Sequence, residues 1–519
     1  MLLHDSLDFF ARERGDQLCI ECGSSRLTYA EATAHANRLA HALSGAGLAQ
    51  GDRFAVLAKN CLEYPLFYYA GSKSGAAPVP LNYRLAPPEL AYIVRDSGAR
   101  LVIARGELVE QIDGVRSELG DVKTWISLGG PCPDGWIDYQ EWIGAQPESA
   151  PERRGDAEDD LYQMYTSGTT GRPKGAVLTH ANIAANLIQQ MAAMTMLPDD
   201  HTLVVAPLYH AAAGITAIGS MSSGSSMVIH EDFSPVDVVT ALSEGGVTRT
   251  TLVPAMIQAC LVMVPDAAER DYKRLHTIVY GASPIAADVL RKAIEVFRCD
   301  FTQGYGMTET TAALTFLSPA DHRRALGDKP ELLLSAGRPL PGTELRIVDE
   351  NDQSVPSGTV GQIVARGDQI MRGYWNLPEA TTEALEGGWM HTGDAGIIDG
   401  EGYLFIQDRV KDMIVSGGEN IYPREVENAL FEHPAVADVA VLGVPDTKFG
   451  EAVKAIVVLR AGEEASADDL IEFCRSQLAG YKRPRSVDFL PELPRNASGK
   501  VLKKELREKY WEGHTRRVS

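Results

Sequence analysis

The sequence predicts a multidomain protein of the α/β class, and three observations support this fold class. The chain has 519 residues, enough for three or four structural units around a large buried core. Short runs rich in Val and Ile alternate with longer helical patterns and with Gly or Pro, which is typical of α/β units. After about residue 335 the pattern changes to short strands between turns, which indicates an antiparallel or barrel-like subdomain.

The expected elements follow from the positions of the apolar runs. Runs of strand length stand at 53–60, 99–106, 201–207, 225–231 and 276–283. A helical pattern near 64–75 follows the first of these strands. Near the C-terminus the order is helix 424–433, strand 437–445, strand 451–460 and helix 465–479. This length is that of a separate small domain.

The charge balance is acidic, with 49 Lys and Arg against 70 Asp and Glu and a formal net charge of −21. It argues against a nucleic-acid partner, because a phosphate backbone is bound by clustered Lys and Arg. Hydrophobic residues make up 45% of the chain and charged residues 23%, as in soluble globular proteins. The stretch 202–229 lacks Asp, Glu, Lys and Arg, but it contains Pro207 and His210. We therefore expect a buried strand, turn and helix there and no transmembrane segment.

Seven cysteines at irregular positions do not form a disulfide framework. They fit a reducing compartment, and the N-terminus has no apolar stretch long enough for a secretion signal, so we expect a cytoplasmic protein. Cys19 and Cys22 have CxxC spacing, but they lie in an apparent strand without the flanks of a redox motif. Two small buried side chains are the favoured interpretation.

The strongest functional signal is the run Tyr165–Gly175, YTSGTTGRPKG. Its Gly and hydroxyl residues leave a backbone that can fold around an anion with N–H and O–H donors facing inward, and Lys174 supplies a compensating charge. The spacing of Gly168, Gly171 and Lys174 does not match the Walker A pattern. The run therefore predicts a phosphate-holding loop of another type.

This loop resembles the signature of the adenylate-forming (AMP-binding) superfamily, which includes acyl-CoA synthetases, peptide-synthetase adenylation domains and luciferases. Further motifs stand in the family's order between about residues 25 and 505. The resemblance implies a large N-terminal part of two α/β layers plus a β-barrel at 1–408, followed by a small mobile C-terminal domain at 409–519. It also implies an AMP-forming acid–thiol ligase that uses ATP, Mg²⁺ and coenzyme A.

Two later segments resemble the walls of the family's adenine site, Gly281-Ala282-Ser283 and the QGYGMTE run at 303–309. A purine needs a flat apolar face with close backbone, which Tyr305 between glycines supplies. Asp394 and Arg409 resemble the pair that holds the ribose hydroxyls. By resemblance, the ATP- and AMP-binding residues are Thr166, Ser167, Gly168, Thr169, Thr170, Gly171, Gly281, Ala282, Ser283, Gln303, Gly304, Tyr305, Gly306, Met307, Thr308, Asp394 and Arg409. The resemblance makes Glu309 and Thr169 the Mg²⁺ ligands.

The segment 494–500, PRNASGK, resembles the C-terminal loop whose lysine enters the active site. Attack of a carboxylate on the α-phosphorus brings two anions together, and a mobile ammonium offsets the developing charge. The resemblance makes Lys500, Lys174 and His210 the catalytic residues. It makes Lys411 the hinge about which the C-terminal domain rotates between the two half-reactions.

A free thiol is the favoured acceptor, because no Ser-bearing carrier motif follows the C-terminal domain. Arg84 resembles the arginine that acyl-CoA synthetases use on the CoA nucleotide phosphates, and the segment from Ser416 resembles their pantetheine tunnel. The expected CoA-binding residues are Arg84, Ser416, Gly417, Gly418 and Lys482.

The acid pocket is expected beside His210, which resembles the family histidine near the substrate carboxylate. The position that is Tyr in plant 4-coumarate ligases is Ala212 here, which leaves room for an apolar chain and no partner for a phenol. The expected pocket residues are Ala211, Ala212, Gly214, Val253, Pro254 and Met256. The chain as a whole resembles bacterial fatty-acyl-CoA synthetases, so we expect a medium- to long-chain fatty acid.

Three alternatives stay open. Aryl acids of the cinnamate, ferulate or benzoate type also fit an apolar pocket. An acyl-AMP ligase that loads a carrier protein would adenylate an acid without consuming CoA, and a nucleotide-binding module would not catalyse at all. The sequence leaves open the chain length of the acid, homodimer formation and peripheral contact with a membrane.

Overall fold

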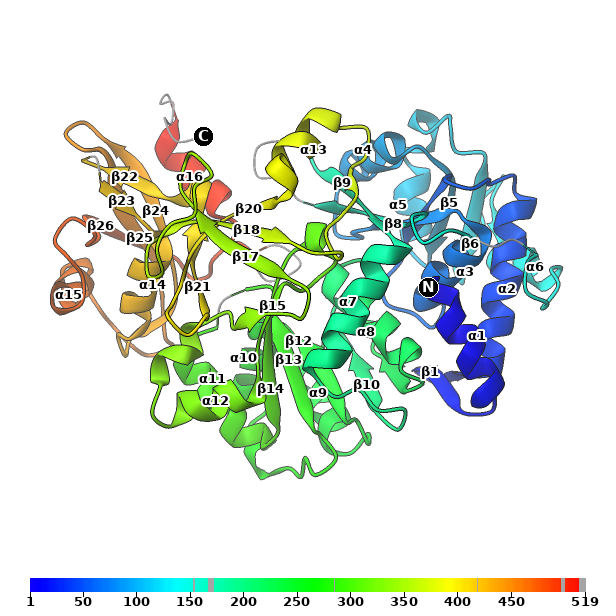
Figure 1. Cartoon of the computed structure of the whole chain (residues 1–519), viewed down its shortest axis with the longest axis horizontal. Helices are drawn as coiled ribbons and strands as arrows, with labels where there is room; N and C mark the ends of the chain where they lie inside the picture. Colours follow the sequence, from blue (N-terminus) through cyan, green and yellow to red (C-terminus); the bar gives the residue numbers. More distant parts are fainter. Residues whose placement is uncertain (153–154, 167–171, 284, 418, 496–499, 513–519) are drawn as a thin grey trace.

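A computed structural model of the chain describes residues 1–152, 155–166, 172–283, 285–417, 419–495 and 500–512. It has the mixed α/β architecture that the sequence predicts, with helices packed on the faces of several sheets (Figure 1). The N-terminal elements lie at one end of the molecule and the C-terminal elements at the other.

The largest sheet has nine strands, of which the six central ones, β14 to β1 in the order below, run parallel. In order across the sheet they are β16 (Arg338–Pro339), β15 (Thr315–Leu317), β14 (Asp300–Tyr305), β13 (Thr277–Gly281), β12 (Arg249–Leu252), β10 (His201–Val204), β11 (Ser226–Ile229), β1 (Leu18–Cys22) and β2 (Ser25–Thr28). Buried parallel strands read as continuous apolar runs, which is why 201–207, 225–231 and 276–283 were recognisable.

A second, five-stranded sheet is parallel throughout. Its strands in order are β4 (Ala77–Leu81), β3 (Arg53–Leu57), β5 (Ala99–Arg105), β6 (Thr124–Leu128) and β7 (Ile137–Asp138). The expected strands at 53–60 and 99–106 are both in this sheet. The helices of this half are α1 (Leu3–Glu13), α2 (Tyr29–Gly45), α3 (Tyr64–Ser74), α4 (Pro87–Ser97), α5 (Leu108–Asp113) and α6 (Tyr139–Gly144).

Two antiparallel sheets complete the part before residue 410. A three-stranded sheet contains β19 (Gly373–Tyr374), β9 (Lys174–Thr179) and β8 (Asp160–Thr166). A four-stranded sheet contains β17 (Glu344–Val348), β18 (Gly361–Arg366), β20 (Met390–Ile398) and β21 (Leu404–Arg409). The antiparallel texture expected after residue 335 is therefore present. The helices of this part are α7 (His180–Ala193), α8 (Ala211–Ser222), α9 (Pro235–Ser243), α10 (Pro254–Met263), α11 (Ala287–Phe297), α12 (Pro319–Leu326) and α13 (Pro378–Ala384).

The C-terminal elements form their own sheet and their own buried core. The strands are β22 (Ile414–Ser416), β23 (Glu419–Ile421), β24 (Val436–Asp446), β25 (Gly450–Leu459) and β26 (Ser486–Phe489), and the helices are α14 (Pro423–Phe431), α15 (Ala467–Phe473) and α16 (Lys503–Trp511). The expected helix–strand–strand–helix order is confirmed. A 3₁₀ helix at Val410–Asp412 separates β21 from β22, and the division at 408/409 stays a prediction.

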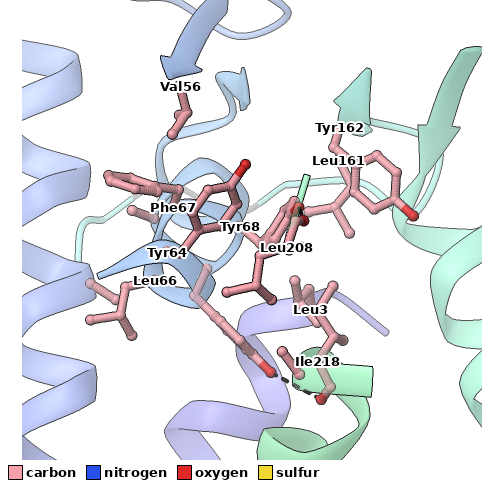
Figure 2. Close-up of a cluster of buried hydrophobic side chains, with 14 of the residues drawn as sticks. Leu3, Val56, Tyr64, Leu66, Phe67, Tyr68, Leu161, Tyr162, Leu208 and Ile218 are labelled. Atoms are coloured by element: carbon pink, nitrogen blue, oxygen red, sulfur yellow. Dashed lines mark hydrogen bonds between the residues drawn. The ribbon is translucent and has the colours of Figure 1, made fainter. Parts of the chain in front are cut away.

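The largest buried cluster packs α1, α2, α3 and α8 together, and Figure 2 shows its aromatic centre around Tyr64, Phe67 and Tyr68. Tyr68 donates its hydroxyl to the carbonyl of Leu208 at 2.9 Å. The carboxamide of Asn60 accepts from the Leu208 N–H at 2.8 Å and donates to the carbonyl of Ala206 at 3.1 Å. These buried bonds fix the turn that leads into α8.

No helix of the described residues is long and apolar enough to cross a membrane. The charge-free stretch 202–229 forms β10, α8 and β11, which is the strand, turn and helix expected from the sequence. Cys19 is fully buried and Cys22 is half-buried in β1, and both are free thiols.

We expect His180 to make stability depend on pH. The buried His180 accepts the Leu3 N–H at Nδ1, at 3.1 Å, and burial lowers its pKa to about 4. In the unfolded chain the His180 pKa is near 6.5, so on acidification the unfolded chain takes up a proton on His180 before the folded chain does. The free energy of unfolding is therefore highest above about pH 6.5 and falls toward pH 4. His180 alone should lower the free energy of unfolding by about 2 kcal/mol between pH 7.5 and pH 5.

Urea unfolding at the two pH values measures this effect. His180→Asn keeps an acceptor but does not titrate, so it should lose less stability on acidification than the wild type. His276→Asn, at a side chain that is 62% exposed, is the matched control and should keep the wild-type pH dependence. An unchanged pH dependence in His180→Asn would contradict the assignment.

Candidate active site

The expected phosphate loop connects β8 to β9. Thr166 is the last residue of β8 and pairs with Lys174, the first residue of β9. Ser167, Gly168, Thr169, Thr170 and Gly171 lie outside the described residues. The structure therefore places the two ends of the loop, with Lys174 at the start of a buried strand.

The end of β14 lies too close to Gly281 for a side chain at that position. Gly281 pairs with Gly304, and a Cβ on Gly281 would lie 2.2 Å from the Gly304 carbonyl oxygen. A Cβ on Gly306 would lie 2.2 Å from the carbonyl oxygen of Ala312. Ala282 has a positive φ of 65°. This backbone surface, followed by Ser283 on one side and Met307 and Thr308 on the other, can lie against a flat ligand.

Tyr305, Asp394 and Arg409 form one hydrogen-bonded group. The Tyr305 hydroxyl donates to Asp394 Oδ2 at 2.8 Å, and Arg409 Nε lies 3.0 Å from Asp394 Oδ1. Burial and the Asp394 charge raise the pKa of Tyr305 well above its ordinary value, so its hydroxyl stays a donor. Gln303, two residues earlier, has a buried side-chain oxygen with no hydrogen-bond partner among the described residues. It can accept from a ligand.

Lys500 lies within electrostatic range of this group although it comes from the C-terminal part of the chain. Burial lowers the pKa of Lys500, and the charge of Arg409 lowers it further, while Asp394 and Glu309 raise it. The structure thus brings together Lys500, Arg409, Asp394 and Glu309, which the sequence analysis had assigned to one site from separate motifs. Segment 496–499 before the lysine is outside the described residues.

His210 is the residue before α8, and its ring centroid lies 4.4 Å from that of Tyr209. Burial lowers the pKa of His210 to about 4, and the charges of Lys500 and Arg84 act in the same direction. The imidazole is therefore neutral at pH 7. Its buried Nε2 has no hydrogen-bond partner among the described residues, so it is available to a ligand.

Glu309 is 5% exposed and lies in the 3₁₀ helix Thr308–Thr310. The hydroxyl of Tyr374 donates to Glu309 Oε1 at 2.8 Å, and the ring of Tyr374 lies below the ammonium of Lys174. Tyr374 was not expected at the site, because it stands 65 residues after Glu309 and no local pattern marks it. Within the described residues no group of three or more His, Cys, Asp and Glu could hold a metal ion.

The expected acid-pocket residues lie on α8 and at the junction of β12 with α10. Ala212 is exposed, whereas Ala211 and Gly214 on the same helix are buried. Val253 and Met256 are half-buried and Pro254 is buried. One turn after Ala212, the hydroxyl of Thr216 lies 3.0 Å from that of Thr251. The expected pocket residues are thus apolar, and one hydroxyl pair lies close to them.

The expected CoA-binding residues that the structure describes contact different partners. Arg84 is exposed, and its charge contributes to the lowered pKa of His210. Ser416 and Gly417 contact β25 and Phe449 within the C-terminal sheet, and Gly418 is outside the described residues. Lys482 pairs with Glu425 at 2.7 Å.

An ion cluster connects the C-terminal elements to the strand before the expected hinge. Lys503 lies 3.0 Å from Asp408 and 2.8 Å from Glu427, and all three side chains are largely buried. Arg507 pairs with Asp412 at 2.6 Å. Lys411, between these two carboxylates, has a pKa lowered to about 8 by burial.

Comparison with known proteins gives matches along most of the chain. The model of the AMP-binding enzyme family matches residues 7–375, and that of the AMP-binding enzyme C-terminal domain matches residues 425–500. The chain is 39% identical to a feruloyl-CoA synthase of Amycolatopsis sp over 501 residues, which cover 96% of this chain and 97% of that protein.

Other relatives are fatty-acid ligases. The chain is 36% identical to the fatty acid–[acyl-carrier-protein] ligase ScoC of Streptomyces coeruleorubidus, over 100% of this chain and 98% of that protein. It is 38% identical to the long-chain-fatty-acid–CoA ligase FadD13 of Mycobacterium tuberculosis, over 93% of each. Among solved structures, ATP-bound MatB from Rhodopseudomonas palustris matches with a TM-score of 0.89 and 31% identity, over 99% of this chain and 100% of that one.

Gly281→Ala should weaken the binding of AMP, the ligand that the matching family model names. The new Cβ would meet the Gly304 carbonyl oxygen at 2.2 Å and force the two strand ends apart. We expect the dissociation constant for AMP, measured by calorimetry, to rise about tenfold or more. Gly144→Ala is the control, because its Cβ would meet nothing within 4 Å. Unchanged AMP affinity in a folded Gly281→Ala protein would contradict the geometry.

Proposed function

This chain belongs to the AMP-binding enzyme family and is an AMP-forming acid–CoA ligase, and we propose that its acid substrate is apolar, a medium- to long-chain fatty acid. The reaction converts the carboxylate, ATP and CoA into acyl-CoA, AMP and pyrophosphate through an acyl-adenylate. The observation that supports the proposed residue roles is the hydrogen-bonded group of Tyr305, Asp394 and Arg409, whose charges act on Lys500.

In the first half-reaction the substrate carboxylate attacks the α-phosphorus and pyrophosphate leaves. Lys500 offsets the charge that develops where carboxylate and phosphate meet, and Lys174 does the same at the leaving phosphates. Asp394 and Arg409 bind the ribose hydroxyls. His210 is neutral, and with its proton on Nε2 it donates to the carboxylate. None of these groups has to change its protonation state for this step.

The residues present fit Mg²⁺ bound together with the phosphates of ATP. Glu309 offers one buried carboxylate, and the described residues form no cage of several ligands. This suits Mg²⁺, which keeps water and phosphate oxygens as ligands and takes one or two carboxylates from the protein. When bound, the ion neutralises phosphate charge. Thr169, the second expected ligand, is outside the described residues.

In the second half-reaction the CoA thiol displaces AMP from the acyl-adenylate. The C-terminal elements rotate about Lys411, which withdraws Lys500 and breaks the contact Asp408–Lys503, whereas Asp412 and Arg507 both follow the hinge and move together. Rotation moves Ser416 and Gly417 toward the site, and it leaves Arg84 free to bind the CoA phosphates. Lys482 is paired with Glu425, so it contributes to CoA binding only if that pair opens.

The fatty-acid proposal is supported by the wall of small and apolar residues next to His210. Ala212 is exposed on α8, and Val253 and Met256 present apolar surface from the neighbouring junction. An apolar chain gains free energy in proportion to the area that it buries on such a wall. Two relatives, FadD13 and ScoC, are named for fatty acids.

An aryl acid is the second candidate, because one observation favours it. The hydroxyls of Thr216 and Thr251 form a polar point on an otherwise apolar wall, where a phenol could donate a hydrogen bond. The relative with 39% identity is named a feruloyl-CoA synthase. The third candidate is a ligase that transfers the acyl group to a carrier protein in place of CoA. The relative ScoC is named a fatty acid–[acyl-carrier-protein] ligase.

Lys500→Ala should separate the two half-reactions. We expect pyrophosphate release with acid and MgATP to fall by about 10²- to 10³-fold, because a charge-stabilising donor is lost. Conversion of added acyl-adenylate and CoA to acyl-CoA should stay close to wild type. Lys504→Ala, at a 76% exposed side chain near by, is the control and should change neither rate. Equal loss in both half-reactions would refute the proposed role of Lys500.

A panel of acids tests the substrate class. Octanoate, decanoate and palmitate should give higher kcat/KM in AMP release than ferulate, cinnamate and benzoate, and release should require CoA. Thr216→Val should leave the fatty-acid values unchanged. Thr382→Val removes a hydroxyl that makes the same bond to the carbonyl four residues earlier on an exposed helix, so it is the matched control. A preference for ferulate that Thr216→Val abolishes would establish the aryl alternative, and pyrophosphate release without acyl-CoA formation in the presence of CoA would favour the carrier.

A further inference from the structure

Tyr374 touches two groups of the active site that are far apart in the sequence. Its hydroxyl donates to Glu309 Oε1 at 2.8 Å. Its ring lies below the ammonium of Lys174, with 4.9 Å between Nζ and the ring centroid. One phenol therefore bridges the carboxylate and the lysine that the proposed function assigns to Mg²⁺ and to the phosphates.

The backbone around Tyr374 is bonded to both neighbours. In β19, Tyr374 pairs with Ala176 of β9, the strand that begins with Lys174. The N–H of Trp375 donates to the Gly175 carbonyl at 2.8 Å, and the N–H of Met371 donates to the Glu309 carbonyl at 2.8 Å. The segment 371–375 thus connects the phosphate loop to the turn that carries Glu309.

Trp375 anchors the other face of this segment. Trp375 is the turn residue that directly follows β19, and its side chain has a different partner from that of Tyr374. Its ring lies under the guanidinium of Arg53, with 3.6 Å to the centroid. Arg53 in turn pairs with Asp160, the first residue of β8, at 2.5 Å, and both side chains are more than nine-tenths buried. This anchor restricts movement of the Tyr374 backbone relative to β8 and β9.

The two contacts of Tyr374 have separate physical effects. Glu309 is 5% exposed, and burying a carboxylate without a hydrogen-bond donor costs free energy. The Tyr374 hydroxyl supplies that donor at Oε1 and leaves Oε2 for another partner. The ring face attracts the ammonium of Lys174, which limits where that flexible side chain points.

We infer that Tyr374 is a positioning residue for MgATP: it orients the Glu309 carboxylate toward the metal ion and holds Lys174 over the phosphates. The inference rests on the proposed roles of Glu309 and Lys174. Tyr374 itself makes no bond to the reacting atoms and acts through Glu309 and Lys174. Outer-shell partners of this kind commonly change metal affinity by about 10- to 100-fold.

Tyr374→Phe tests the hydroxyl, because it removes the donor and keeps the ring. Calorimetric titration with ATP, without acid, at a series of Mg²⁺ concentrations measures how much Mg²⁺ is needed to tighten ATP binding. We expect that concentration to rise about tenfold in Tyr374→Phe, with unchanged ATP affinity in the absence of Mg²⁺. In kinetics, kcat of pyrophosphate release should fall, while the KM for the acid and the rate from added acyl-adenylate stay as in the wild type.

Tyr374→Leu tests the ring. Without the ring, Lys174 loses its support, so ATP affinity in the absence of Mg²⁺ should also fall, by about threefold or more. Identical Mg²⁺-free affinities of Tyr374→Leu and Tyr374→Phe would overturn the role assigned to the ring.

Tyr403→Phe is the matched control, because it removes another hydroxyl that donates to a carboxylate, Asp321, at 2.5 Å. It should bind MgATP like the wild type. The inference is overturned if Tyr374→Phe keeps the wild-type Mg²⁺ dependence, or if Tyr403→Phe shows the same shift. Failure to release pyrophosphate with any acid would instead count against the proposed function, since the binding titration needs neither acid nor acceptor.

Discussion

The carboxylate of Asp394 is the constraint on which the rest of the site depends. It lies on β20, accepts a hydrogen bond from Tyr305 on β14 and pairs with Arg409 on β21. The side chain is 13% exposed, and a charge with so little water needs both partners. The nine-stranded sheet and the four-stranded antiparallel sheet must therefore be docked before this group exists. Once it exists, it offers Lys500 an anion to approach.

The same reasoning applies to the contact between the two parts of the chain. Lys503 lies between the buried carboxylates of Asp408 and Glu427, and separation would leave at least one of them without its cation. Breaking a buried pair on one side typically costs about 3–5 kcal/mol. A rotation about Lys411 is thus possible only if water or new partners replace Lys503. The ion pairs of Lys503 therefore also stabilise the conformation in which Lys500 is at the site.

Elements that depend on a continuous run of residues could be predicted from the sequence. Contacts between residues far apart in the chain could not. The parallel strands, the glycine pair at Gly281 and Gly304, and the C-terminal sheet all follow from local runs, because burial and close approach leave marks at each position. Tyr374 and the Arg53–Trp375 contact leave no such mark, since each is defined by a neighbour more than 60 residues away. The assignment of Arg84, Ser416, Gly417, Gly418 and Lys482 to CoA stays a prediction.

The acid pocket shows why one substitution does not define a substrate. Thr216 lies six residues after His210, about 9 Å farther along the helix axis, in the region where we propose that the acid binds. Thr216 donates to the Ala212 carbonyl at 2.8 Å and lies 3.0 Å from the Thr251 hydroxyl. Both hydroxyl protons therefore have acceptors, and an apolar chain beside them leaves no donor unpaired. A phenol is accommodated only by bringing its own donor to these oxygens, so the apolar chain is the occupant that the wall accepts without any polar partner.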